Sequence, residues 1–305
     1  MLSMPTVSVR VPATTGNVGS GFDCLGMALE LYNTVDVSED GDGLTVEVVG
    51  EGAQTVPRDA TNLCVRAAQT VFDRAGVRPA GLRFVLHHAI PVSRGLGSSG
   101  VGIVAGAVAA NELAGCPLDT AGLLRVCTDL EGHPDNVVPS LLGGLSISGE
   151  RDGQIVYRTF DIPRNLMGVV AVPDFTLDTA VARRALPDRV PMHDAVFNLC
   201  SVGLLVSGLL SGDYSLIRAG MDDRLHQPYR QHLIPGLPDV IAAALDAGAH
   251  GAALSGAGPT VIALASHSQP QIGAAMIDAF RRHGITSRSL ILHADNEGTQ
   301  VMRRE

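Results

Sequence analysis

The chain has 305 residues, a formal net charge of -9, 46% hydrophobic residues and only 17% charged residues. The length suits two domains, and the composition is typical of a folded protein with mixed helices and strands, which excludes a disordered chain. The acidic balance argues against nucleic acid as a partner, because proteins that bind it need a basic surface.

The chain begins with alternating β-branched residues at Thr6–Val11, a pattern that predicts a strand. Ala13–Leu25 is rich in Gly, Thr, Asn and Ser, so we expect a functional loop there. Tyr32–Val37 and Leu44–Val49 are predicted to form a strand pair, joined through the acidic turn 39–43. The next predicted elements are helices at Asn62–Ala75, Ser98–Leu113 and Leu123–Leu130, and strands at Leu82–Leu86 and Ser140–Ile147.

The helix predicted at Ser98–Leu113 contains Gly100, Gly102 and Gly106. Each glycine inside a helix costs about 1 kcal/mol relative to alanine. We therefore expect another backbone or a ligand to approach this helix closely.

A second unit is predicted to begin with a strand at Met167–Val172, after a polar turn at Gly149–Gly153. We place the domain boundary near residue 160, which gives an N-terminal domain at 1–160 and a C-terminal domain at 161–305. The remaining predictions are helices at Met192–Leu210, Leu216–Leu225, Leu237–Ala247 and Gln271–His283, and strands at Thr260–Ala265 and Ser287–His293.

A glycine-rich segment, Ser93–Gly100, lies between a predicted strand and a predicted helix. Small residues let successive backbone N–H groups approach a phosphate, and the helix N-terminus adds partial positive charge. All 22 positions counted as Lys or Arg are Arg, which excludes the lysine-dependent phosphate loops of P-loop proteins and protein kinases. A single loop of this kind is also a common tight turn.

Four polar segments interrupt the otherwise apolar chain: Asn17–Asp23, Gly95–Ser99, Glu131–Asn136 and Ser255–Pro259. Loops carry function when a scaffold brings them together. The hydroxyl of Ser99 and the carboxylate of Glu131 are hard oxygen ligands of the kind that Mg²⁺ accepts beside a phosphate. Asp129 is a rival carboxylate for this role.

These segments resemble the motifs of the GHMP small-molecule kinases. The phosphate-binding motif of that family is similar to Pro91-x3-Gly95-Leu96-Gly97-Ser98-Ser99, and its C-terminal glycine motif to Leu254–Pro259. Two further segments resemble the homoserine kinase branch of this family. They are Pro12-Ala13-Thr14-x2-Asn17-x-Gly19-x-Gly21-Phe22-Asp23-x2-Gly26 and Glu131–Asn136 with Val137-x-Pro139. The resemblance covers nearly the whole chain in order. Gly100 departs from it, because the family usually has alanine there.

The resemblance implies an α+β, two-domain GHMP kinase fold, with an N-terminal domain like ribosomal protein S5 domain 2 and a ferredoxin-like C-terminal domain. It implies Mg²⁺-dependent transfer of phosphate from ATP to the side-chain hydroxyl of L-homoserine, giving O-phospho-L-homoserine for threonine biosynthesis. The nucleotide positions of the family correspond to Asn62, Pro91, Arg94, Gly95, Leu96, Gly97, Ser98 and Ser99. The metal positions correspond to Ser99 and Glu131, and the substrate positions to Asn17, Asp23, His133, Asn136, Thr179, Arg183, Arg230 and Gly256.

The charges at these positions suit an amino acid, since Asp23 can pair with its ammonium group and Arg183 and Arg230 with its carboxylate. Arg184 is the rival of Arg183, because either arginine could be a solvated helix charge. The catalytic residues implied are Glu131, Asn136 and Asp135. We expect the Asn136 amide to orient the substrate hydroxyl, with Asp135 as general base the alternative.

Other interpretations stay open. Another small-molecule kinase of the superfamily or the related diphosphomevalonate decarboxylase is the first alternative, but paired arginines with Asp23 suit an amino acid, whereas a diphosphate substrate would favour more cations. A nucleotide or metabolite sensor that has lost catalysis is a second alternative. The presence of both Ser99 and Glu131 disfavours a sensor. A dinucleotide-binding oxidoreductase is weaker still, because the spacing Gly95-x-Gly97-x2-Gly100 lies about ninety residues into the chain and its acidic partner would be Asp119.

The five cysteines are an odd number without Cys-x-x-Cys spacing, which indicates reduced thiols. No signal peptide is evident, and apolar runs such as Val202–Leu210 are too short to span a bilayer. We therefore expect a cytoplasmic protein whose partners are ATP and L-homoserine, with no nucleic acid and no membrane; a homodimer is left open.

Overall fold

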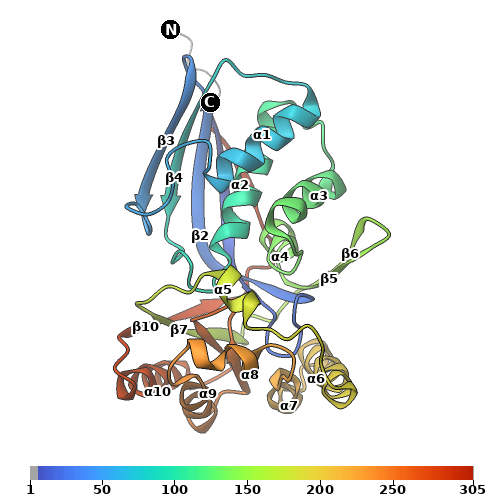
Figure 1. The fold of residues 1–305 in the computed structure, drawn as a ribbon, viewed down its shortest axis with the longest axis vertical. Helices are drawn as coiled ribbons and strands as arrows, with labels where there is room; N and C mark the ends of the chain where they lie inside the picture. The colour runs from blue at the N-terminus through green and yellow to red at the C-terminus, as the bar shows by residue number, and fades with distance from the viewer. Residues whose placement is uncertain (1–5, 305) are drawn as a thin grey trace.

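Two β-sheets, one above the other in Figure 1, organise the computed structural model, which describes residues 6–304. The upper sheet has seven strands, and helices α1 to α4 cover one of its faces. Its main path runs β11-β1-β2-β4-β3, and β5 pairs with both β2 and β6. These strands are β1 (Thr6–Gly16), β2 (Leu25–Glu39), β3 (Gly43–Gly50), β4 (Gly81–His88), β5 (Leu145–Arg151), β6 (Gln154–Phe160) and β11 (Gln300–Arg304).

The predicted pairing of Tyr32–Val37 with Leu44–Val49 is wrong. β4 lies between β2 and β3, antiparallel to β2 and parallel to β3. Parallel strands need a long crossover connection, and α1 (Leu63–Ala75) lies in the connection between β3 and β4. The acidic turn marks where the chain reverses, whereas the neighbour of each strand depends on packing across the whole sheet.

The helices of this half are α1, α2 (Ser98–Leu113), α3 (Thr120–Glu131) and α4 (Val137–Leu142). The predicted helices at Asn62–Ala75 and Ser98–Leu113 are confirmed. The strand predicted from Ser140 is wrong in its first residues, because α4 extends into it. Gly143 and Gly144, both with positive φ, separate α4 from β5.

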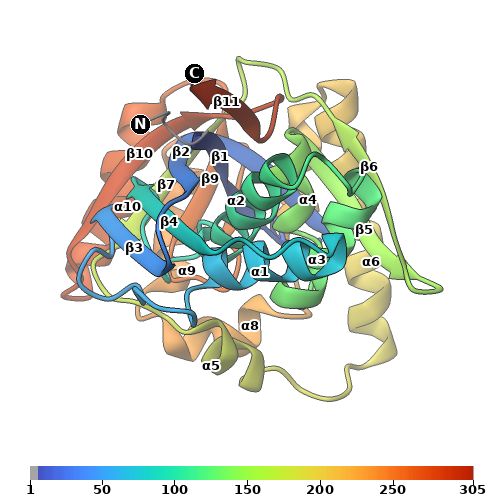
Figure 2. The same ribbon diagram turned by 90° about the horizontal axis from the view of Figure 1, so that it is seen from above.

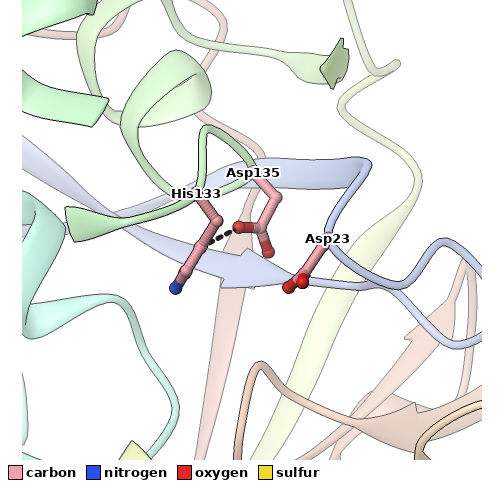
Figure 3. Close-up of side chains that lie close together, drawn as sticks. All are labelled: Asp23, His133 and Asp135. Carbon is pink, nitrogen blue, oxygen red and sulfur yellow. Dashed lines mark hydrogen bonds and ion pairs between the residues drawn. The ribbon is translucent and has the colours of Figure 1, made fainter. Parts of the chain in front are cut away.

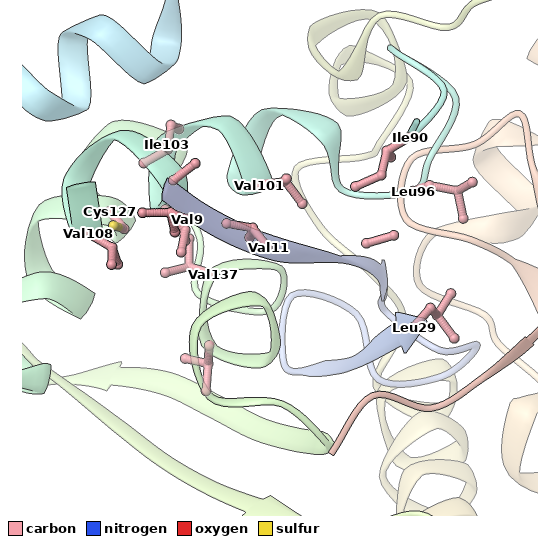
Figure 4. Close-up of a cluster of buried hydrophobic side chains, with 14 of the residues drawn as sticks. Val9, Val11, Leu29, Ile90, Leu96, Val101, Ile103, Val108, Cys127 and Val137 are labelled. Atoms are coloured by element: carbon pink, nitrogen blue, oxygen red, sulfur yellow. The ribbon is translucent and has the colours of Figure 1, made fainter. Parts of the chain in front are cut away.

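A continuous core lies between the upper sheet and α2 (Figure 4). Val9 and Val11 of β1 and Val101 of α2 have no exposed surface. The close approach expected at the glycines of α2 is confirmed at Gly106, where a Cβ atom would lie 1.9 Å from the backbone oxygen of Cys64 in α1. α2 is thus a buried helix fixed between the sheet and α1.

The lower sheet has four strands in the order β10-β7-β9-β8, all antiparallel. Helices α9 and α10 lie against it (Figure 1). This strand order and the succession β–α–β–β–α–β are those of a ferredoxin-like unit. The elements are β7 (Met167–Pro173), β8 (Gly251–Leu254), β9 (Val261–Ala265), β10 (Ser287–His293), α9 (Leu237–Asp246) and α10 (Gln269–Arg282).

Between β7 and β8 the chain forms several further helices. The helix predicted at Leu216–Leu225 is confirmed in its first part and wrong after Met221, because α7 ends there and the next residue, Asp222, is extended. The helices are α5 (Thr179–Arg184), α6 (Met192–Ser211), α7 (Ile217–Met221) and α8 (Gln227–Arg230), with 3₁₀ turns at Tyr214–Leu216 and Gln231–Leu233.

Helix α6 is long and apolar enough to cross a membrane by length and composition, with a mean hydropathy of 1.6 in its most apolar window. The run Val202–Leu210 is much shorter than the helix, which also contains the apolar residues Met192, Val196, Phe197 and Leu199 before that run. In the structure, 28% of that window is buried.

Strand β11 brings the end of the described chain back to the upper sheet, where it pairs antiparallel with β1 (Figure 2). Gln300–Arg304 therefore differ from the rest of the segment predicted as the C-terminal domain, because they cover an edge of the first sheet. β6 ends at Phe160 and β7 begins at Met167; the boundary near residue 160 itself stays a prediction.

Candidate active site

The four polar segments meet at one cavity of about 110 Å³. Loops that follow or precede strands of both sheets contribute to its wall, and α5 and α8 add side chains from the lower half. The additional lining residues are Ser93, Leu177 and Ala257. The predicted site residues that line it are Asn17, Asp23, Gly95, Gly97, Ser98, Ser99, Glu131, His133, Asp135, Asn136, Thr179, Arg183, Arg230 and Gly256.

The glycine loop is fixed by close backbone contacts. Gly95 and Gly97 have φ of +80° and +71°, a region that other residues rarely adopt. A Cβ atom at Gly95 would lie 2.3 Å from the Ser255 backbone oxygen, and one at Gly97 would lie 1.9 Å from Thr14 Oγ1. No side-chain cap precedes α2 among the described residues. Its first backbone N–H groups therefore suit an anion at the edge of the cavity.

A second cavity, of about 680 Å³, adjoins the first at the glycine loop, because Ser93, Ser98 and Ser99 line both. Asn62 and Arg94, predicted near the nucleotide, line it as well. Its remaining wall is largely apolar. The loop thus stands between a small polar cavity and a larger, less polar one.

Some predicted nucleotide residues have structural roles. Pro91 and Leu96 are buried and lie outside the linings of both cavities. The Asn62 amide accepts from Cys64 N at 2.9 Å and so caps α1, and it donates to Pro57 O at 2.7 Å. Asn62 therefore holds a wall of the larger cavity in place.

Ser99 and Glu131 lie together at the small cavity, where Ser99 Oγ donates to Glu131 Oε1 at 2.7 Å. Burial raises the pKa of Glu131, and the bond from Ser99 opposes this rise. Adjacent ligand oxygens of an octahedral Mg²⁺ lie about 3 Å apart, so the pair fits this ion. The rival Asp129 is exposed on α3 and pairs with Arg74 and Arg125.

A chain of hydrogen bonds links the polar residues between α3 and α4. His133 Nδ1 contacts Asp135 Oδ1 (Figure 3), Asn136 Nδ2 donates to Asp135 Oδ2 at 3.2 Å, and Thr14 Oγ1 donates to Asn136 Oδ1 at 2.7 Å. Burial alone would lower the pKa of His133, but the bond to Asp135 and the charges of Asp135 and Glu131 raise it. Both oxygens of Asp135 are therefore engaged.

Asp23 and Arg183 form a bidentate ion pair beside this chain. Arg183 Nη1 donates to Asp23 Oδ2 at 3.0 Å, and Nη2 donates to Oδ1 at 2.8 Å. The two side chains are 33% and 37% exposed. Arg230 is only 1% exposed, and burial and the charge of Arg183 lower its pKa to about 10. It still carries its charge at neutral pH, and the rival Arg184 is exposed.

The loop after β1 holds Asn17 and Asp23 with a strained backbone. Asn17, Val18 and Asp23 have φ of 66°, 46° and 51°, and each such residue costs roughly 1–2 kcal/mol. Asn17 compensates by donating to Gly256 O at 2.8 Å and accepting from Asp23 N at 2.9 Å. Strain of this kind clusters at functional sites.

Two aromatic residues lie next to these charges: Phe22, which the sequence motif contained without a predicted role, and His226, which was not predicted as a site residue. The ring of Phe22 lies 5.9 Å from the Arg183 guanidinium and 5.3 Å from that of Arg230. His226 stacks on Phe22 with ring centroids 5.2 Å apart. One signal was available, since His226 precedes Arg230 by one helical turn.

Comparison with known proteins identifies the family. The chain matches the models for the GHMP kinases N terminal domain at residues 62–144 and the GHMP kinases C terminal at residues 205–284. It is 46% identical over 295 residues to a homoserine kinase of Moorella thermoacetica, covering 96% of this chain and 99% of that one. A homoserine kinase of Synechococcus sp. (strain WH7803) is 47% identical over 300 residues, with 96% and 95% covered.

A solved structure agrees with these relatives. The homoserine kinase from Cytophaga hutchinsonii matches with a TM-score of 0.89 at 32% identity, covering 99% of this chain and 98% of that one. The chain has the same two-domain architecture. It therefore belongs to the GHMP kinase family, within the group of the homoserine kinases.

Proposed function

We propose that this protein transfers the γ-phosphate of ATP to L-homoserine, giving O-phospho-L-homoserine and ADP in threonine biosynthesis. The observation that carries the proposal is the pair of cavities that meet at one glycine loop. The larger cavity suits a nucleoside, and the small one presents both signs of charge to a zwitterion. Its relatives are named homoserine kinases, which supports this substrate.

The nucleotide phosphates would lie along Gly95–Ser99, at the N-terminus of α2, where backbone N–H groups and the helix dipole favour an anion. Ser99 and Glu131 would hold Mg²⁺. When bound, this ion neutralises charge on the transferred phosphoryl group. Burial raises the pKa of Glu131. A cation bound between the two side chains would offset the free-energy cost of burying the charged carboxylate.

The acceptor would place its ammonium group at Asp23 and its carboxylate at Arg183 and Arg230. The Asp23–Arg183 pair is partly exposed, so each side chain can exchange its partner for the substrate group of the same charge, which offsets the loss of the pair. The hydroxyl oxygen forms the new bond to phosphorus while the bond to the bridging oxygen of ADP breaks. Asn136 would orient this hydroxyl, whose proton leaves to the phosphate or to solvent. Asp135 as a general base is the alternative, since both residues line the cavity.

The decisive experiment is a coupled assay of ADP release with L-homoserine, mevalonate and galactose as acceptors, and with no acceptor as a control. We expect turnover with L-homoserine only, and a phosphomonoester product by ³¹P NMR. Turnover of mevalonate without turnover of L-homoserine would contradict the proposal. We also infer a cytoplasmic location, which the free thiols support. Fractionation of intact cells that express the protein tests this location separately.

A further inference from the structure

Arg230 is a buried cation whose guanidinium is held on one side only. Its Nε donates to Ala182 O at 3.3 Å, and its Nη1 donates to Gly256 O at 3.3 Å. Nη1 also lies 3.2 Å from Nδ1 of His226. Within residues 6–304, Nη2 has no hydrogen-bond partner, and Arg230 lines the small cavity. Nη2 is therefore the atom available to a ligand.

The contacts of His226 define its tautomer. Nε2 lies 2.8 Å from the backbone oxygen of Gly19 and 3.5 Å from Oδ2 of the buried Asp223. A carbonyl oxygen and a carboxylate oxygen only accept, so Nε2 carries the proton. Burial lowers the pKa of His226, and although the charge of Asp223 opposes this, the pKa stays below its ordinary value; the guanidinium donor beside Nδ1 also fits a neutral ring. Nδ1 then has a free lone pair, which accepts the hydrogen bond from Arg230 Nη1.

The ring of His226 is itself fixed by a second set of contacts behind the cavity. Asp223 Oδ2 accepts from the backbone N–H of His226 at 2.9 Å, and Asp223 Oδ1 accepts from Asn198 Nδ2 at 2.9 Å. The same amide of Asn198 donates to Ser20 O at 3.0 Å. Phe22 stacks on the ring. His226 and these supports join α6, α8 and the loop that carries Asp23.

We propose that His226 is a positioning residue for the amino-acid substrate: it orients Arg230 so that Nη2 meets the substrate carboxylate. Through Gly19 it also ties that arginine to the loop that presents Asp23 to the ammonium group. The proposal rests on the proposed function and deepens it. The reacting hydroxyl and the nucleotide are held by other residues, so loss of His226 acts on the affinity for the acceptor.

Two substitutions at His226 test the roles of the two ring nitrogens separately. His226→Asn keeps an acceptor near the Nδ1 position, whereas His226→Gln keeps a donor near Nε2 and loses the acceptor for Arg230. We expect His226→Gln to raise the KM for L-homoserine about 10–100-fold, the range for a hydrogen bond to a charged group. His226→Asn should raise it about threefold or less, and the KM for ATP should change little in both. Equal effects of the two substitutions on the KM for L-homoserine would overturn the proposal.

Truncated acceptors distinguish positioning from general damage. 3-Aminopropan-1-ol lacks the carboxylate of homoserine, and 4-hydroxybutyrate lacks the ammonium group. In competition binding, His226→Gln should weaken 4-hydroxybutyrate and leave 3-aminopropan-1-ol unchanged. Equal weakening of both would show a merely structural role and overturn the proposal. If the unmodified protein fails to phosphorylate L-homoserine, it is the proposed function that fails.

A measurement on the unmodified protein does not depend on the folding of any variant. Labelling histidine with ¹⁵N reports the tautomer of each ring. We expect the Nε2–H form for His226, and a change in its Nδ1 shift when 4-hydroxybutyrate binds but not when 3-aminopropan-1-ol binds. An Nδ1–H tautomer, or a shift that is the same for both ligands, would overturn the proposal.

Discussion

The two sides of the proposed active site use different chemical groups: backbone N–H groups on the nucleotide side and charged side chains on the acceptor side. On the nucleotide side, the glycine loop offers backbone N–H groups and is placed by contacts that leave no room for a Cβ atom. On the acceptor side, charged side chains are held by other side chains, as Arg230 is by His226. Phosphates are alike in all nucleotides, so a backbone loop suffices for them. Choosing one small acceptor requires a few placed charges.

Glu131 stands where the two sides meet, and its loss should have the largest effect. Glu131→Gln keeps the size of the side chain but removes the charge, so we expect kcat to fall about 10²–10³-fold. Mg²⁺ with ADP should no longer raise the melting temperature as it does in the unmodified protein. Asp129→Asn, on the exposed face of the same helix, is the control. A larger loss of kcat in the Asp129→Asn variant would identify Asp129 as the metal ligand instead.

Arg183 tests whether the acceptor side depends on individual charges. Arg183→Gln should raise the KM for L-homoserine about 10–100-fold, because a charge-assisted bond to the carboxylate is lost. The KM for ATP should stay the same. Arg184→Gln is the matched control, since this neighbour is exposed. If Arg184→Gln gave the larger rise, the assignment of the two arginines would be reversed.

Gly97 tests whether the nucleotide side depends on backbone shape. Gly97→Ala places a Cβ atom against Thr14, so we expect a destabilisation above about 2 kcal/mol and a KM for ATP about tenfold higher. Gly76 has a similar φ of 68° but open space around it. Gly76→Ala should therefore cost only about 1 kcal/mol and leave the kinetics unchanged. Equal losses of stability in the two variants would show that the positive φ alone, and not the contact with Thr14, accounts for the effect at Gly97.

Substitutions of Asn136 and Asp135 test which residue orients or deprotonates the hydroxyl of the substrate. Asn136→Ala should raise the KM for L-homoserine and lower kcat, each about fivefold, as expected for one neutral hydrogen bond. Asp135→Asn should have a smaller effect on kcat and add no new step to the pH–rate profile. A general base typically contributes about 10²–10⁴-fold. Loss of that size in a folded Asp135→Asn protein that binds both substrates would identify Asp135 as the base.

The smallest expected effect is the pH dependence of stability. Burial lowers the pKa of His226 in the folded state below its unfolded value of about 6.5. Stability is therefore retained above that value and lost as the pH falls below it, because the unfolded chain binds the proton first. Chemical denaturation should show a steeper loss in the unmodified protein than in His226→Gln, by at most about 1.4 kcal/mol per pH unit.

His88 and His250 provide the internal check on this measurement. Burial lowers the pKa of both, so they contribute the same sign of slope. They are present in both proteins and cancel in the difference. Identical slopes would mean that His226 has an ordinary pKa, in conflict with its burial beside Arg230.

Local features of the fold could be predicted from the sequence because their causes are local. The apolar spacing that predicts the helix at Asn62–Ala75, and the glycine after its end, depend on residues within a few positions. Strand order depends on contacts across the sheet, so the position of β4 between β2 and β3 and the return of β11 were not predictable from turns. The end of α7 at Met221, four residues before the predicted end, was not predictable for the same reason: it depends on contacts with distant parts of the chain.

The site shows the same division. The motifs predicted Asn17, Ser99 and Glu131 as residues of one site, and these residues line the same cavity. The burial of Arg230 and its bond to His226 were not predictable, because an arginine after proline is more often at the surface. The pairing of Asp23 with Arg183 also joins residues from different halves of the molecule, which no local pattern records.

Strand β11 has a consequence for how the molecule is made. On the ribosome, β1 emerges early and pairs with β2, but its other edge has no partner until β11 has been synthesised. The upper sheet can be completed only after the lower one has left the ribosome. A fragment that stops near residue 160 would leave β1 as an open edge, available to other chains. Conversely, β1 and β11 lie side by side, so joining them and opening the chain at an exposed turn elsewhere would be a compatible rearrangement.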